Sequence, residues 1–194
     1  MKALMVDCLT PLEADSIVEL ADKFTFERAG VVTSNGVKEA DIRTNSTAKI
    51  ESKRLGDCIN RAVYRWSEQI AELLPDSINV KEMPLPGIGY VQSWFEPLAF
   101  LRYEVGEQYN WHYDRSVGES FQTNIEDREL SVVLYLNDDF EGGETEMLGE
   151  TFTPVKGKAL VFPSCWTFPH RSKPVTKGTK YAVVTWYRFS PPPP

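Results

Sequence analysis

The feature that most constrains the fold is a change of texture after Pro75. From there on, short runs rich in β-branched and aromatic residues alternate with turns rich in Gly, Pro and Asp, which is typical of an all-β sandwich or barrel. Each run has the length of one strand, and the runs are VQSWF, LAFLRYEV, QYNWHYD, ELSVVLYLN, ETEMLG, KALVFP, WTFPH and KYAVVTWYRF. Gly142 and Gly143 suit a turn that requires positive φ. We therefore expect a β core in the second half of the chain.

Two helices are expected before this core. Thr10, Pro11 and Glu13 form a helix start, with a capping hydroxyl, a proline at the first helical position and an acid three residues after the cap. Apolar residues then follow at helical spacing: Ala14, Ile17, Val18, Ala21 and Phe24. From Leu55 until a proline ends the pattern, a second apolar face comprises Ile59, Ala62, Val63, Trp66, Ile70 and Leu73. Residues 25–48 indicate short strands and loops, and both helices should pack on the outside of the β core.

The length of 194 residues is enough to bury one full core and too short for two comfortable ones. We expect a single domain over residues 1–194. Within it, residues 1–76 form a helical support region and residues 77–190 form the β core. The last four residues, PPPP at 191–194, should be an extended polyproline II tail.

Composition excludes several classes of partner. The start, MKALMVDCLTPLEADS, has no apolar run of signal-peptide or membrane-span length, so we expect a soluble protein that is not exported. An odd count of three cysteines, Cys8, Cys58 and Cys165, argues against a purely disulfide role and suits a reducing cytoplasm. The net charge of -7 and the pI of about 5.0 argue against nucleic acid, which demands an excess of basic residues.

The candidate chemistry starts from the two histidines of the chain. His112 and Asp114 lie two residues apart, which puts both side chains on one face of a strand. Taken alone this pair is weak evidence, but His170, the other histidine, follows further strands, and a closed β structure could bring it beside the pair. Two imidazoles and one carboxylate make the facial triad that holds non-haem Fe(II) and leaves coordination positions open.

Lys180 begins the run KYAVVTWY, and side chains of a strand alternate between its faces. One face of this strand therefore comprises Lys180, Ala182, Val184 and Trp186. If that face is the interior, Lys180 is a buried cation that needs an anionic partner, and the carboxylate of a bound small acid would serve. The alternative is a solvent-facing lysine on an edge strand.

Four motifs, in order, carry a resemblance to a known family: YEVGEQYNWHYD, RELSVVLYLNDDFEGGET, PVKGKALVFP and HRSKPVTKGTKYAVVTWY. Together they resemble the catalytic domain of the prolyl 4-hydroxylases, within the Fe(II)- and 2-oxoglutarate-dependent dioxygenases, over roughly residues 95–190. The resemblance implies a mainly β fold with N-terminal helices (α+β), built on a double-stranded β-helix, or jelly-roll and cupin-like, core with packed supporting helices.

The same resemblance implies a role for each matching residue. His112, Asp114 and His170 are the expected catalytic metal ligands. Lys180, Tyr103 and Thr145 are expected to bind 2-oxoglutarate, and Tyr109, Arg128 and Trp186 to contact the substrate. Strict alternation places Tyr109 on the face opposite to His112, so its role depends on a β-bulge or on its place at the start of the strand.

The function that the resemblance implies is hydroxylation of peptidyl proline at C4, with Fe(II) as cofactor and O2 and 2-oxoglutarate as cosubstrates. Succinate and CO2 are released, and ascorbate keeps the iron reduced. Three alternatives stay open: the same chemistry on another side chain or a free amino acid, a non-catalytic peptide-binding module, and a nucleic-acid demethylase, against which the acidic balance speaks. The polar stretch at residues 115–127 is a candidate lid. The physiological substrate and the oligomeric state stay open.

Overall fold

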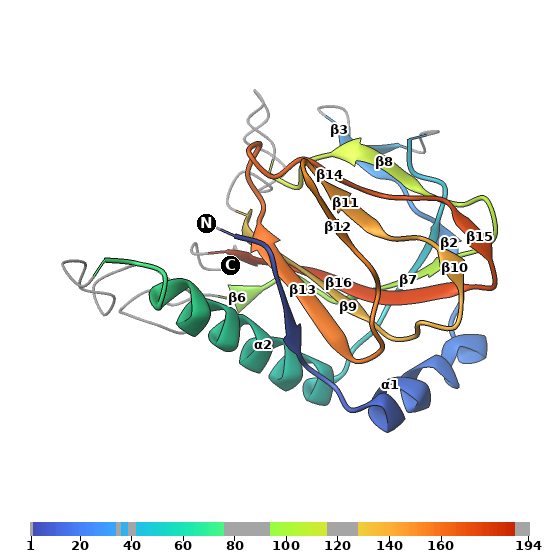
Figure 1. The fold of residues 1–194 in the computed structure, drawn as a ribbon. Helices are drawn as coiled ribbons and strands as arrows, with labels where there is room; N and C mark the ends of the chain where they lie inside the picture. Colours follow the sequence, from blue (N-terminus) through green and yellow to red (C-terminus); the bar gives the residue numbers. More distant parts are fainter. Residues whose placement is uncertain (1, 34–35, 39–41, 76–93, 116–127, 189–194) are drawn as a thin grey trace.

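The computed structural model describes residues 2–33, 36–38, 42–75, 94–115 and 128–188, and Figure 1 shows their arrangement. The predicted proline tail and residues 116–127 of the candidate lid lie outside the described residues. Every strand pair in the described parts is antiparallel.

A large sheet forms the main layer. Its strands follow the order β1 (Leu4–Asp7), β13 (Lys158–Pro163), β9 (Arg128–Tyr135), β16 (Lys180–Arg188), β7 (Ala99–Tyr103), β5 (Ser46–Lys49) and β2 (Glu27–Arg28), with β6 (Trp94–Phe95) paired to β16. Strands that are far apart in the sequence are therefore neighbours in this sheet, since β1 near the N-terminus pairs with β13. The run that begins at Lys180 forms the central strand β16, which pairs with both β9 and β7.

A smaller sheet faces the large one (Figure 1). Its strands follow the order β12 (Glu150–Phe152), β11 (Thr145–Met147), β14 (His170–Ser172) and β8 (Tyr109–His112). Two short ladders complete the β structure: β10 (Glu141–Gly142) with β15 (Val175–Lys177), and β3 (Val31–Thr33) with β4 (Gly36–Lys38). The two facing sheets form the jelly-roll core that the sequence predicts.

The first helix begins where its capping signals predict. Helix α1 (Pro11–Val18) starts with the complete capping box of Thr10 and Glu13, and a 3-10 turn, η1, follows at Ala21–Lys23. Helix α2 (Lys53–Ala71) is capped by Ser52 and lies along the outer face of the large sheet (Figure 1). Its predicted apolar face is buried except for Leu73, which lies beyond the helix end and is 66% exposed.

The large sheet is buried on both faces. On the outer face, Val132, Leu134 and Val161 share one apolar cluster with Ile59 and Trp66 of α2. On the inner face, two further clusters fill the space toward the small sheet; they are Ala3, Tyr135, Met147, Leu160 and Phe162, and Leu101, Tyr103, Val175 and Val184. The helix thus supports the sheet from outside, and the inner face is left for the cavity described below. The predicted division of the chain into one domain with three segments stays a prediction.

Two expectations about local structure are wrong. The run WTFPH is not a strand, because Phe168 N donates a hydrogen bond to Cys165 O in a turn, and β14 begins only at His170. The cysteines are not all reduced, because Cys8 and Cys58 form a disulfide with a Cα–Cα distance of 5.4 Å, while Cys165 is a free thiol. The disulfide links the segment after β1 to α2, a fold proximity that cysteine spacing does not reveal.

None of the helices in the described ranges is long and apolar enough to cross a membrane. The cytoplasmic location expected from the sequence stays a prediction. Disulfides are typical of oxidising compartments, so the cysteines give that location no support.

Candidate functional site

The three predicted metal ligands converge on one point. Strands β8 and β14 pair so that His112 lies directly opposite His170, and Asp114 follows two residues after the first histidine. The nitrogen and oxygen ligand atoms of the three residues all lie within 4.8 Å of one another. The Nε2 atom of His112 is 3.6 Å from Asp114 Oδ1, and the Nε2 atom of His170 is 3.5 Å from Asp114 Oδ2.

Both imidazoles present the same nitrogen toward this point. The Nδ1 atom of His112 lies 2.7 Å from the carbonyl oxygen of Asn110, and that of His170 lies 3.1 Å from the carbonyl oxygen of Phe168. A carbonyl only accepts hydrogen bonds, so Nδ1 carries the proton and Nε2 keeps a free lone pair. Burial and the neighbouring His170 lower the pKa of His112 to about 3, so its ring is neutral at physiological pH.

The carboxylate of Asp114 is ionised and oriented. Burial raises its pKa, but the imidazoles of His170 and His112 and the hydroxyl of Ser131 outweigh this and lower the pKa to about 2. Ser131 Oγ donates a hydrogen bond of 2.6 Å to Asp114 Oδ2, and the hydroxyls of Ser131 and Ser164 lie 2.8 Å apart. One carboxylate and two imidazole nitrogens are the donor set that Fe(II) takes in facial-triad sites, so these residues fit the metal.

A small cavity of about 50 Å³ extends from the three ligands between the two sheets. Its lining residues are Arg43, Leu101, Tyr103, Tyr109, His112, Asp114, Val133, Thr145, His170, Arg171, Ser172, Lys180, Ala182, Val184 and Trp186. The predicted face of β16, from Lys180 to Trp186, thus lines the cavity.

Lys180 is a buried cation at the inner part of this cavity. It is 2% exposed, and its Nζ atom donates to Gly143 O at 2.6 Å and to Ser172 Oγ at 2.9 Å. Within the described ranges no ion pair joins it to a carboxylate. Burial lowers its pKa to about 7, against the opposing influence of Glu144. The ammonium therefore gains charge stabilisation from any anion that enters the cavity.

Tyr103 and Thr145 lie beside Lys180. Tyr103 is its register partner on β7, with Lys180 Nζ 5.0 Å from the ring centroid, and burial raises the pKa of Tyr103 to about 12. Thr145 Oγ1 lies 2.7 Å from the hydroxyl of the buried Tyr135. Gly143 has a φ of +68°, and a Cβ at this position would lie 3.2 Å from Lys180 Cδ, so the predicted turn glycine also makes room for the lysine.

A β-bulge resolves the placement of Tyr109. The register between β8 and β14 shifts between the pairs His112 with His170 and Tyr109 with Ser172, so the extra residue in β8 turns Tyr109 to the same side as the ligand. The Tyr109 ring stacks on the His112 ring, with centroids 3.5 Å apart. Trp111 and Tyr113 face outward and are 39% and 46% exposed. The bulge therefore brings Tyr109 into the cavity wall.

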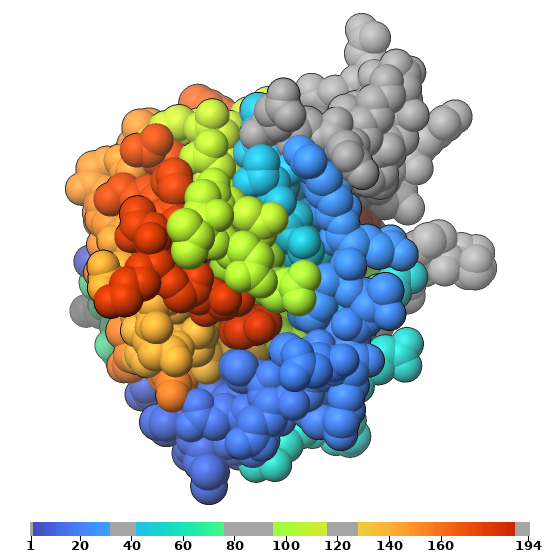
Figure 2. Space-filling view, turned by 90° about the vertical axis from the view of Figure 1, so that its right-hand side faces the viewer, coloured from blue at the N-terminus to red at the C-terminus, as the bar shows by residue number. Residues whose placement is uncertain are grey.

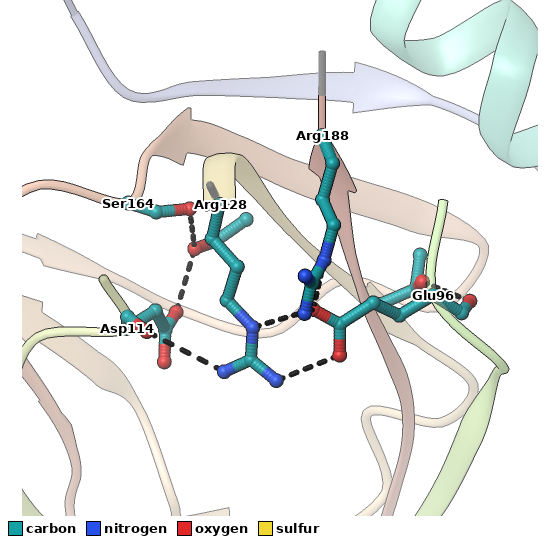
Figure 3. Close-up of polar contacts among 7 residues, drawn as sticks. Glu96, Asp114, Arg128, Ser164 and Arg188 are labelled. Atoms are coloured by element: carbon teal, nitrogen blue, oxygen red, sulfur yellow. Dashed lines mark hydrogen bonds and ion pairs between the residues drawn. The ribbon is translucent and has the colours of Figure 1, made fainter. Parts of the chain in front are cut away.

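Arg128 and Trp186 lie together at the side of Asp114. The guanidinium carbon of Arg128 is 3.6 Å from the centroid of the Trp186 ring. Figure 3 shows that the same guanidinium points toward Glu96 and toward the backbone of Asp114. Trp186 lines the cavity, and its buried Nε1 has no hydrogen-bond partner in the described parts of the chain.

Sequence reasoning missed several residues of the site. Ser172 follows His170 by two residues on one strand face, so the alternation rule could have found it; Ser131 shares its strand face with the cavity residue Val133 for the same reason. Arg43, whose guanidinium carbon lies 4.7 Å from the Tyr109 ring centroid, had no such signal. It comes from the loop before β5, and in Figure 2 that segment, in cyan, lies beside the green β8 segment.

Comparisons with known proteins agree with this geometry. Residues 98–188 match the family model described as the 2OG-Fe(II) oxygenase superfamily. The chain is 45% identical over 71 residues to prolyl 3-hydroxylase 2 of Homo sapiens, which is 33% of this chain and 10% of that protein. It is 33% identical over 121 residues to probable prolyl 4-hydroxylase 9 of Arabidopsis thaliana, which is 50% of this chain and 42% of that protein. The chain thus spans less than half the length of either relative.

Among solved structures, the viral collagen prolyl hydroxylase of Paramecium bursaria Chlorella virus-1, in its 2OG complex, superposes with a TM-score of 0.67. The alignment covers 98% of this chain and 97% of that chain at 19% sequence identity. At this identity the superposition shows a shared fold, and it extends over the helices as well as the β core.

Proposed function

We propose that this chain, whose residues 98–188 match the 2OG-Fe(II) oxygenase superfamily, is a prolyl 4-hydroxylase-like member of that superfamily. It hydroxylates peptidyl proline at C4 and releases succinate and CO2. The observation that carries the proposal is the pairing of two unlike groups in one cavity. One group is the donor set for Fe(II), formed by His112, Asp114 and His170. The other is the buried ammonium of Lys180, which can bind the carboxylate of an acid.

The metal role of the three ligands rests on their protonation states. The two Nδ1–H groups are held by backbone carbonyls, which aims both Nε2 lone pairs at the point that the ionised Asp114 faces. Bound there, Fe(II) supplies activation of O2 and oxidative decarboxylation of 2-oxoglutarate. The chain itself supplies ligands, orientation and a dry cavity.

The cosubstrate role falls to Lys180 with Tyr103, Thr145 and Ser172. The ammonium and the two hydroxyls of Thr145 and Ser172 are positioned to meet a carboxylate, since all three line the cavity and Ser172 already bonds Lys180. A carboxylate would give the ammonium an opposite charge as partner, which the carbonyl of Gly143 and the hydroxyl of Ser172 do not. We propose that 2-oxoglutarate binds in this cavity with one end at the metal ligands and the other carboxylate at Lys180.

The substrate is proposed to be a proline-containing peptide or protein, and Tyr109, Trp186 and Arg128 are the predicted contacts. Tyr109 and Trp186 support this role, because both line the cavity next to the metal ligands. Ascorbate as reductant and a cytoplasmic location belong to the proposal as well, without a structural observation behind them.

Hydroxylation at C3 is the second candidate, because one of the similar proteins is a prolyl 3-hydroxylase. The carbon that reacts is the one held nearest the oxidant, and a shift of about one ångström in the substrate decides it. The metal site alone does not decide between C3 and C4, so the test below measures the position of the hydroxyl group.

The test loads purified protein with Fe(II) and 2-oxoglutarate without oxygen, adds a proline-rich peptide and then admits air. The expected result is succinate together with a peptide heavier by one oxygen, with NMR placing the hydroxyl group at C4. Omission of 2-oxoglutarate and the variant His112→Ala serve as controls, and both should abolish the mass gain.

Other outcomes assign the alternatives. A hydroxyl group at C3 would replace the proposed position, and succinate without any gain on proline would indicate another side chain or a free amino acid. Peptide binding without succinate formation in the iron-loaded protein would indicate a non-catalytic module and overturn the proposal.

A further inference from the structure

Three charged side chains, Glu96, Arg128 and Arg188, form a cluster beside Asp114 (Figure 3). The carboxylate of Glu96, which lies between β6 and β7, accepts two hydrogen bonds of 2.7 Å from Arg128, one on each oxygen. It also accepts from Nε of Arg188 at 2.8 Å. The three side chains are only 7% to 14% exposed, so the cluster is shielded from solvent.

The backbone of Glu96 is fixed at both of its polar groups. Its N–H donates to Trp186 O at 2.9 Å, and its carbonyl accepts from Thr185 Oγ1 at 2.7 Å. Both partners belong to β16, the central strand of the large sheet. The carboxylate therefore has a rigid base, and it can hold a guanidinium in one place.

Arg128 connects this carboxylate to two residues of the site. Its Nη1 reaches Asp114 O at 3.4 Å, and its guanidinium plane covers the Trp186 ring at 3.6 Å. Bidentate binding by Glu96 sets the orientation of the plane, and that orientation decides both contacts. Arg128 is not among the residues that line the cavity, and its Nε, Nη1 and Nη2 donors point to Glu96 and Asp114.

Asp114 is thus held from two directions. Ser131 fixes its carboxylate through Oδ2, and Arg128 contacts its backbone carbonyl. Asp114 lies just beyond the end of β8, outside the regular ladder that fixes the two histidines. A ligand on such a segment depends on contacts of this kind for its position.

We infer that Glu96 is a positioning residue of the metal centre: it holds Arg128 so that the guanidinium fixes the backbone at Asp114 and the plane of Trp186. The inference rests on the proposed metal site. It also gives Arg128 a role different from the peptide contact predicted from the sequence. The arginine then acts on the site through the backbone of Asp114 and the ring of Trp186, without contacting the peptide.

The test compares Glu96→Gln with the wild-type protein in binding of Co(II), whose visible absorption reports ligand geometry without turnover. Gln keeps the shape but loses the charge and one bidentate acceptor. We expect Co(II) affinity to fall by about 10-fold or more, with a changed absorption spectrum. With iron loaded, succinate should form in excess over hydroxylated peptide, because the site is assembled less accurately.

The matched control is Val63→Ala, which removes buried volume from α2 and lowers stability at a distance from the cavity. It should leave Co(II) affinity and spectrum unchanged. An equal change in Val63→Ala would show that any loss of stability alters the centre, and the inference would be overturned. Arg128→Lys, which cannot bind Glu96 with two parallel bonds, is measured alongside and takes the place of Glu96→Gln if that variant does not fold.

The outcomes separate this inference from the proposed function. If the wild-type protein fails to bind Co(II), the proposed metal site fails and the inference fails with it. If the wild-type protein binds Co(II) and both Glu96→Gln and Arg128→Lys match its affinity and spectrum, only the inference is overturned. A rise in peptide KM alone in Arg128→Lys, with an unchanged Co(II) spectrum, would restore the arginine to the peptide-binding role.

Discussion

The two ends of the cavity differ in how their charges are balanced. At the metal end, the carboxylate of Asp114 accepts from Ser131 and lies near two imidazoles and Arg128. At the inner end, Lys180 has only a carbonyl and a hydroxyl as hydrogen-bond partners in the described structure. The negative charge of Asp114 therefore has stabilising partners before any ligand binds, whereas the positive charge of Lys180 has no carboxylate beside it in the described structure.

This difference shows up in the two pKa values. The pKa of Asp114 is lowered to about 2 in spite of its burial, whereas burial lowers the pKa of Lys180 from 10.5 to about 7. The folded chain therefore favours the charged carboxylate and disfavours the charged ammonium. The metal end is organised in advance, and the inner end gains its stability when an anion arrives.

The largest effect should follow from breaking the metal end. Asp114→Ala or His112→Ala removes a ligand, and turnover should fall by more than about 100-fold, because even partners behind the ligands cost 10- to 100-fold. Tyr113→Ala is the matched control, since this side chain lies between the two ligands in sequence and faces outward. Iron-dependent succinate formation and circular dichroism measure activity and fold, and retained turnover in a folded ligand variant would remove that residue from the centre.

The next effect concerns the inner end. Lys180→Met removes the cation, and the affinity for 2-oxoglutarate should drop by roughly 100-fold, as for loss of one partner of a buried charge pair. Isothermal titration with Co(II)-loaded protein measures the affinity. The affinity for Co(II) itself should stay near the wild-type value, and an unchanged 2-oxoglutarate affinity would exclude Lys180 from the cosubstrate site.

The same substitution should stabilise the protein without ligand. A lysine whose pKa is lower in the folded state destabilises the fold fully below about pH 7, progressively less as pH rises, and no longer above about 10.5. Lys180→Met should therefore raise the free energy of unfolding by on the order of 5 kcal/mol at pH 6, and the gain should vanish near pH 10.5. Urea unfolding at several pH values tests this, with the exposed Lys49→Met as control; a gain independent of pH would contradict the charge explanation.

The smallest effect should come from Thr145. Thr145→Val keeps the shape and removes the hydroxyl, so 2-oxoglutarate affinity should fall by about 1 kcal/mol, or roughly fivefold. Tyr135→Phe removes the same Thr145 hydrogen bond from the other side and should weaken binding less, because the threonine hydroxyl stays. Equal losses in the two variants would make Thr145 a support of the core and not a direct contact.

The parts of the site that could be predicted are those that a strict period of two controls. The cavity-lining face of β16, which begins at Lys180, follows from alternation. His112 and Asp114 were expected to share one strand face, but β8 ends at His112 and Asp114 lies just beyond it. His170 was expected because it is the other histidine of the chain. Tyr109 broke the rule because a bulge inserts a residue in β8, and alternation alone does not specify where a strand bulges.

Other features depend on tertiary proximity that no local pattern contains. Glu96 contacts Arg128 and Arg188, which lie 32 and 92 residues away in the chain. The Cys8–Cys58 disulfide spans 50 residues and does not suit the reducing cytoplasm expected from the sequence, whereas the free Cys165 agrees with the expectation that the role of the cysteines is not purely disulfide. The fold class was accessible because strand length and turn composition are local. The disulfide forms only once the segment after β1 lies against α2, and Glu96 meets the two arginines only once β9 and β16 have paired.

The direct opposition of His112 and His170 across two strands has a consequence for order within the cavity wall. Strand β8 is short and ends the small sheet, and it carries Tyr109. An ion held by both imidazoles would fasten β8 to β14 from the side-chain side, where the ladder is interrupted by the bulge. Metal binding would then stabilise this wall as well as support the chemistry. Without iron, β8 would be held less firmly against β14, and the cavity would be less ordered when the substrate binds.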